Sequence, residues 1–99
     1  MTADGFWEDV DDQLVRLSTA RSPEEVFAIC PPVASVSVGA GFFFGDGDDV
    51  MAALFDAGWI LMWSKAPYYW AMWAPYARAG LTYVEGDLER GVTNPSPVS

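Results

Sequence analysis

The feature of this sequence that most constrains its fold is a run of aromatic and apolar residues at positions 59–73. Four of the five tryptophans lie in it. A chain of 99 residues has a small interior in which to bury so much aromatic surface. We therefore expect that the run forms much of the core, or that a partner covers part of it. A membrane span over residues 50–73 is disfavoured, because Asp56, Lys65 and Pro67 interrupt the apolar sequence.

The composition is that of one ordered domain. Hydrophobic residues make up 52% of the chain and charged residues 19%, which is unlike a disordered protein. We predict a single α+β domain over residues 1–91. Residues 92–99 have two prolines and no periodicity, and we expect them to form a flexible C-terminal tail.

The charge balance is strongly acidic and limits the partners. Fourteen Asp and Glu residues face five Lys and Arg residues, for a net charge of -9. Direct binding to nucleic acid or to an anionic membrane needs clustered basic residues, so we expect neither. The lone cysteine, Cys30, excludes an internal disulfide, and the acidic start of the chain is unlike a signal peptide. We therefore expect a cytoplasmic protein.

Three helices are predicted before Gly58. An apolar stripe at helical spacing predicts a first helix over residues 4–18. Ser22 followed by Pro23 and Glu25 is typical of a capped helix start, with Ser22 as N-cap and Glu25 closing a capping box. The aspartates at 46–49 predict the N-terminus of a third helix, which ends at a left-handed Gly58.

The remainder is predicted to be β structure. Strands over residues 59–64, 68–74 and 81–85 would form a three-stranded antiparallel meander on which the three short helices pack. Residues 33–45 are glycine-rich and predict an irregular connection, with at most an edge strand around Val36 and Val38 and three phenylalanines that plug the core. The predicted core comprises Phe6, Val10, Leu14, Leu17, Phe27, Leu54, Phe55, Ile60 and Val84.

The aromatic hairpin is the candidate binding surface. Strand alternation places Trp59, Leu61 and Trp63 on one face of the first strand and Ile60 with Met62 on the other. Both faces of the sheet are then apolar, while three short helices cover only one. Either the Phe-rich loop covers the rest, or the large aromatic residues remain partly exposed, or the face binds a partner or a second copy. The candidate partner-binding residues are Trp59, Trp63, Tyr69, Trp70 and Trp73.

Residues 41–91 resemble small uncharacterised proteins of mycobacteriophages and related actinobacterial phages. The resemblance rests on Gly-Phe-Phe-Phe-Gly-Asp-Gly-Asp-Asp from Gly41, and on Leu-Thr-Tyr-Val-Glu-Gly-Asp-Leu-Glu-Arg-Gly from Leu81. Phe6-Trp7-Glu8-Asp9 and Ser22-Pro23-Glu24-Glu25 extend it over most of the chain. It implies a phage protein made in the cytoplasm of a bacterial host, and it brings no catalytic residue with it.

Catalytic and metal chemistry are disfavoured. The run from Asp46 lacks the bidentate Glu that a calcium loop needs at its twelfth position, where Ala57 stands. The carboxylates of Glu85, Asp87 and Glu89 fit a solvated turn better than an acid–base pair. The chain has no histidine, so Cys30 lacks the usual base and most zinc sites are excluded. We expect no enzyme, no cofactor and no metal.

Two functions remain open. The first is a non-enzymatic interaction protein that binds and modulates a host or phage protein through the aromatic sheet or the acidic rim. The second is an acidic nucleic-acid mimic that blocks a DNA-binding enzyme. The acids cluster in the first helix and at two turns instead of following a regular spacing, which favours the first. A small enzyme is a remote third reading.

Overall fold

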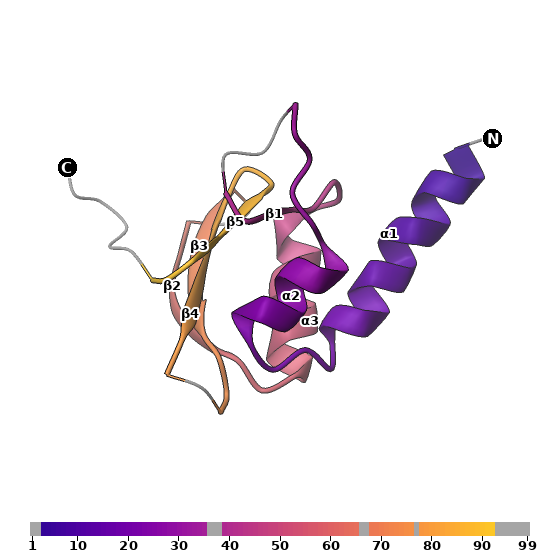
Figure 1. Ribbon diagram of the computed structural model, residues 1–99. Coiled ribbons are helices and arrows are strands. Elements are labelled where there is room, and N and C mark those ends of the chain that lie inside the picture. Colours follow the sequence, from indigo (N-terminus) through magenta and orange to yellow (C-terminus); the bar gives the residue numbers. More distant parts are fainter. Residues whose placement is uncertain (1–2, 36–38, 66–67, 77, 93–99) are drawn as a thin grey trace.

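The protein folds into one five-stranded antiparallel sheet with three helices packed on one of its faces (Figure 1). The structure, a computed structural model, describes residues 3–35, 39–65, 68–76 and 78–92, with side chains from Asp9 onward. In chain order its elements are α1 (Ala3–Leu17), α2 (Pro23–Ile29), β1 (Gly41–Phe42), α3 (Gly47–Asp56), β2 (Ile60–Lys65), β3 (Tyr69–Trp73), β4 (Gly80–Val84) and β5 (Asp87–Arg90). The strand order is β1-β5-β4-β3-β2.

The predicted α+β class is confirmed, but the three-stranded meander is wrong. The chain does not end its β structure after β4. Glu85 and Gly86 take positive φ angles of 48° and 102° and reverse the chain within two residues. β5 therefore pairs with β4, and β1 pairs with β5. Of the carboxylates that were predicted to lie on a solvated turn, Glu85 does lie on the turn, while Asp87 and Glu89 belong to β5.

The predicted helix ends are largely confirmed. The side chain of Ser22 accepts a hydrogen bond from the Glu25 N–H at 3.2 Å, and Glu25 Oε1 accepts one from the Arg21 N–H at 2.9 Å. Gly58 has a φ of +99°, the left-handed conformation expected after α3. Asp46 is at the N-cap position of α3, yet its side chain makes no capping hydrogen bond.

The core lies between the sheet and the helices. Trp70 and Met72 of β3, together with Leu81 and Tyr83 of β4, pack against buried residues of the helical layer. Two tryptophans tie the layers together through their indole N–H groups. Trp59 Nε1 donates to the Ala20 carbonyl at 2.8 Å, and Trp70 Nε1 donates to the Gly47 carbonyl at 3.1 Å. Trp59 and Trp70 of the aromatic run are therefore part of the core.

Three predicted core residues are wrong. Phe55 is 46% exposed, Ile60 is 61% exposed and Val84 is also exposed. Phe55 points away from the stripe that α3 buries, and the other two lie on the sheet face that no helix covers. The prediction holds for Val10, Leu17 and Leu54, which are buried, while Leu14 and Phe27 pack at the edge of the core. The Phe6 side chain lies outside the described part of the chain.

The three consecutive phenylalanines do not act together. Only Phe43 is buried in the core, while Phe44 is exposed and Phe42 is partly buried. An extended chain points successive side chains in opposite directions, so three in a row cannot all face one core. The edge strand predicted around Val36 and Val38 lies outside the described residues. The two edge strands of the described sheet are β1 and β2.

A candidate partner-binding face on the sheet

One face of the sheet is packed against helices and the other is not (Figure 1). Trp70 pairs with Tyr83 and Met72 with Leu81, and all four belong to the core. The intervening residues therefore point away from the helices. We call the surface they form the open face, and its large side chains are Ile60, Trp63, Tyr69, Trp73 and Val84.

A register shift in β2 shapes this face. The pairing moves from Leu61 opposite Met72 to Trp63 opposite Ala71, so Met62 is an extra residue in the strand. The predicted alternation placed Trp63 on the same face as Leu61, and that prediction is wrong. The bulge instead brings Trp63 to the same face as Ile60 and Trp73. A sequence read with strict period two does not reveal a bulge.

The five candidate residues divide into two groups. Trp59 and Trp70 are buried, and each satisfies its indole N–H within the chain, so neither is available to a partner in this conformation. Trp63 and Tyr69 are partly buried on the open face, and Trp73 is 37% exposed. Three of the five candidates are thus brought together on one surface.

Sequence reasoning missed other members of this surface. Ile60 and Val84 were assigned to the core, and Met62, which is 49% exposed, was given no role. The signal that would have found them is the absence of a second set of helices. All three helices precede β2 in the sequence and pack together on one side of the sheet. The other face of β2, β3 and β4 is therefore not covered by them.

The acids of the open face lie along its β5 side. β2 and β3 contain no Asp or Glu, and Lys65 is their only charged residue. Asp87 and Glu89 of β5 pair with Val84 and Thr82, which places both acids on the open face. At that border the Tyr69 hydroxyl donates to Glu85 Oε2 at 3.0 Å, and this hydrogen bond and the charge of Glu85 raise the Tyr69 pKa. The centre of the open face is thus an apolar area in an acidic protein.

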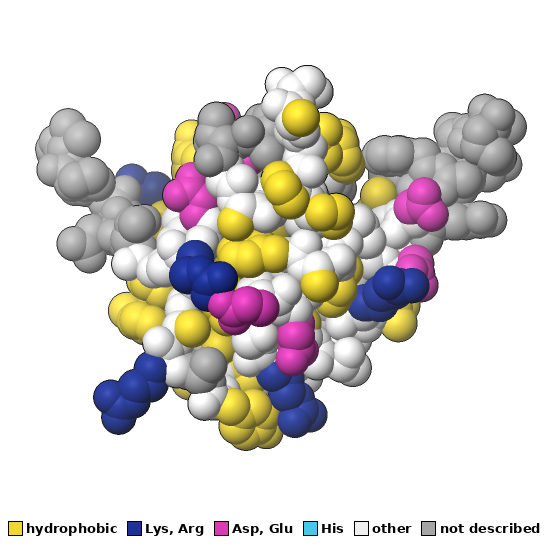
Figure 2. Space-filling model, viewed as in Figure 1, with side chains coloured by type: hydrophobic (Ala, Val, Ile, Leu, Met, Phe, Trp, Pro, Cys, Tyr) yellow, Lys and Arg dark blue, Asp and Glu magenta, His cyan; other side chains and the backbone are white. Residues whose placement is uncertain are grey.

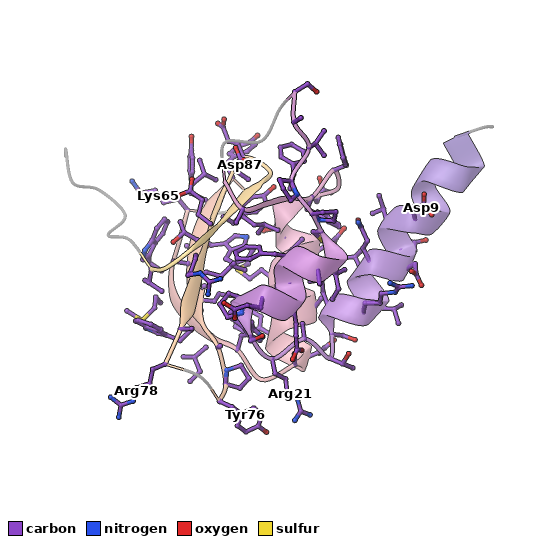
Figure 3. The ribbon with its side chains drawn as sticks, viewed as in Figure 1. Asp9, Arg21, Lys65, Tyr76, Arg78 and Asp87 are labelled. Carbon is purple, nitrogen blue, oxygen red and sulfur yellow. The ribbon has the colours of Figure 1, made fainter. Side chains whose placement is uncertain are left out.

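The free edge of β2 is poorly suited to pairing with another strand. Its bulge interrupts the regular spacing of backbone groups, and Lys65 is its last residue (Figure 3). Both features are ones that proteins use to discourage strand addition. A partner would therefore contact side chains of the face and not the backbone of this edge.

The sequence also offers Cys30 and the acidic side chains as candidate reactive or metal-binding groups. Cys30 is buried, and its burial raises the pKa of the thiol from 9.0 to about 12, which keeps it protonated and unreactive. Within the described ranges, no three Asp, Glu or Cys side chains are grouped so that they would hold a metal ion. No helix there is long and apolar enough to cross a membrane.

Comparison with known proteins adds no relative: no family model, no curated protein and no solved structure matches this chain.

Proposed function

We propose that this protein is a non-enzymatic binding protein that attaches to another protein through the open face. The observation that carries the proposal is the exposure of Ile60, Trp73 and Val84 on a sheet face that none of the described helices covers. Large apolar and aromatic side chains grouped in this way are typical of protein interfaces. The absence of acids from β2 and β3 supports the same reading, because a partner would bury no unpaired carboxylate there.

The resemblance to actinobacterial phage proteins supplies the setting of the proposal. In that setting the chain is made in the host cytoplasm and modulates a host or phage protein by occupying part of its surface. A second copy of the chain is the alternative occupant of the open face.

The nucleic-acid mimic has less support. Figure 2 shows one face of the molecule, on which acidic and basic side chains are interspersed among hydrophobic ones. Arg16 forms an ion pair with Asp12 at 3.0 Å, and Arg90 forms another with Glu24. A mimic of a phosphate backbone needs rows of unpaired carboxylates, and these pairs break up such rows.

The test compares variants of the open face with a matched control. Trp73→Ala and Ile60→Ser remove apolar area from the open face, whereas Phe55→Ala removes a similarly exposed ring from α3. Each tagged protein is used to capture partners from host lysate, and the partner found with the wild type is then purified and titrated. We expect Trp73→Ala to weaken binding by about 2 kcal/mol, or roughly 30-fold in Kd, with an unchanged circular dichroism spectrum.

Two results would contradict the proposal. One is equal loss of binding in Phe55→Ala and Trp73→Ala, which would place the interface elsewhere. The other is an affinity that falls steeply with salt and is insensitive to both open-face variants, as expected of a nucleic-acid mimic. Light scattering of the purified protein, with Trp73→Ala beside it, identifies a homodimer if one forms.

A further inference from the structure

A small cleft lies outside the open face, between the start of α3 and the β4–β5 turn. Its volume is about 350 Å³, and it is lined by Gly45, Asp46, Gly47, Tyr68, Tyr83 and Glu85. This volume is at the lower end of the range for ligand pockets and suits a single side chain or a molecule of that size. The lining combines two tyrosines with two carboxylates, and it contains no basic residue.

The two carboxylates have no basic partner among the ion pairs of the described residues, although Asp46 lies at the N-terminus of α3. Asp46 makes no capping hydrogen bond to α3, and Glu85 accepts one from the uncharged Tyr69 hydroxyl. In the described part of the chain, the ion pairs between side chains join Arg16 to Asp12 and Arg90 to Glu24, and neither reaches the cleft. The two acids that line the cleft are thus available to a cation from outside.

The pKa of the Tyr83 hydroxyl is raised, in part by the negative charges around the cleft. Burial raises its pKa most, a hydrogen bond from the Gly86 backbone lowers it, and the charges of Asp46, Asp48 and Glu85 each raise it further. Three carboxylates therefore act on one point in the wall of the cleft. The net charge of -9 adds to the attraction for a cation approaching from solvent.

The aromatic residues favour one kind of cation. Tyr68 is largely exposed, so part of its ring is open to solvent beside the carboxylates. A guanidinium group is planar, stacks on aromatic rings, and donates paired hydrogen bonds to carboxylates. A hydrated metal ion would gain nothing from the rings, and an ammonium group would make fewer directed hydrogen bonds.

We propose that the cleft formed by Asp46, Tyr68, Tyr83 and Glu85 binds a guanidinium group, as carried by an arginine side chain of a partner protein. Asp46 and Glu85 accept its hydrogen bonds, and Tyr68 covers its plane. This site does not rest on the proposed function, because none of its four residues belongs to the open face.

The test is a titration followed by amide NMR, with N-acetyl-arginine amide as the probe. N-acetyl-citrulline amide is the matched control ligand, since it has nearly the same shape and no charge. We expect saturable shifts of the Gly47 and Gly86 amide signals with the arginine probe only, and a millimolar Kd. Free arginine has the same net charge but adds an α-ammonium and an α-carboxylate, which the side chain of a protein lacks, so a site for a side chain should bind it no more tightly than the blocked probe.

The variants separate a specific site from overall charge. Asp46→Asn and Glu85→Gln should each weaken binding of the arginine probe at least threefold, and the double variant should abolish it. Asp56→Asn removes the same charge at the other end of α3 and should leave the Kd within about 1.5-fold. Asn is itself a good N-cap residue, so Asp46→Asn is expected to fold.

Three outcomes would overturn the proposal: equal binding of the citrulline probe, equal effects of Asp46→Asn and Asp56→Asn, or tighter binding of free arginine than of the blocked probe. The last would identify a site for a free amino acid and not for a protein side chain. Trp73→Ala is expected to leave this titration unchanged, so failure here and failure of the open-face interface are distinguishable.

Discussion

The indole ring of Trp70 and the phenol ring of Tyr83 stack across neighbouring strands, with centroids 5.2 Å apart and planes within 6° of parallel. The two residues are directly paired in the register of β3 and β4. Since Trp70 also donates to the Gly47 carbonyl, one side chain links two strands to the start of α3. This link positions two sides of the cleft between the start of α3 and the β4–β5 turn, because Gly47 and Tyr83 both line it.

Trp70→Phe should therefore destabilise the protein. The change removes a buried hydrogen bond and leaves unfilled volume beside Tyr83, and we expect a loss of about 1–3 kcal/mol in the free energy of unfolding. Trp73→Phe is the matched control, because the same change on the open face should cost less than about 0.5 kcal/mol. Urea denaturation measures both. Equal losses would mean that Trp70 is not the link described here.

A second pair of variants tests which face of α3 is buried. Leu54 is fully buried, and Leu54→Ala should cost about 2–5 kcal/mol. The adjacent Phe55 is exposed, and Phe55→Ala should cost less than about 1 kcal/mol despite removing a larger side chain. Denaturant unfolding of the two variants side by side measures the difference. A larger loss for Phe55→Ala would show that α3 is rotated.

Leu54 and Phe55 also show which features of the fold could be predicted from the sequence. Helix positions followed from capping residues and apolar spacing, as at Ser22 and Glu25, because those signals are local. Which residues at the margin of the stripe are buried depends on the surface that the helix meets. Phe55 was assigned to the core on its hydrophobicity alone, and the structure buries Val50, Ala53 and Leu54 instead.

The sheet was predictable only in part, because some of its features depend on local sequence and others on contacts between distant segments. A strand was predicted over residues 68–74, and β3 lies within that range. β5 was missed because Leu88 is its only apolar residue. It pairs with β4 through a two-residue turn, and on its other side with β1, which is far away in the sequence. The bulge at Met62 has no sequence signal, so Trp63 was assigned to the wrong face.

Alkaline pH should reveal the buried thiol of Cys30. Its folded pKa of about 12 exceeds the ordinary value of 9.0, so its contribution to stability is complete below pH 9 and is lost as pH rises toward 12. We expect the unfolding free energy to fall by up to about 1.4 kcal/mol per pH unit across that window. Tyr69 and Tyr83 have raised pKa values and act in the same direction above pH 10.

The measurement is thermal unfolding of wild type and Cys30→Ala between pH 8 and 10. Cys30→Ala should show a flatter dependence on pH between 9 and 10, below the range in which the tyrosines contribute. A thiol reagent at pH 8 should react with the native protein only as fast as the protein unfolds. Rapid labelling of the folded protein would contradict the burial of Cys30.

Glu85 in the β4–β5 turn has an unfavourable backbone conformation. Glu85 has a φ of 48°, a left-handed conformation that a long side chain adopts at a cost, whereas Asn adopts it readily before a glycine. Glu85→Asn should therefore raise the free energy of unfolding by about 0.5–1 kcal/mol. It should also weaken binding of N-acetyl-arginine amide, because the carboxylate that faces the cleft is removed.

Gly86→Ala is the control for this turn. Gly86 has a φ of 102°, and a methyl group there would lie 2.8 Å from the Phe42 ring, so the variant should lose more than about 1 kcal/mol. Chemical denaturation gives both stabilities, and the NMR titration gives the affinity. A Glu85→Asn protein that is more stable and no longer binds the probe would show that the glutamate is retained for the ligand and not for the fold. A less stable variant would instead assign Glu85 a structural role through its hydrogen bond from Tyr69.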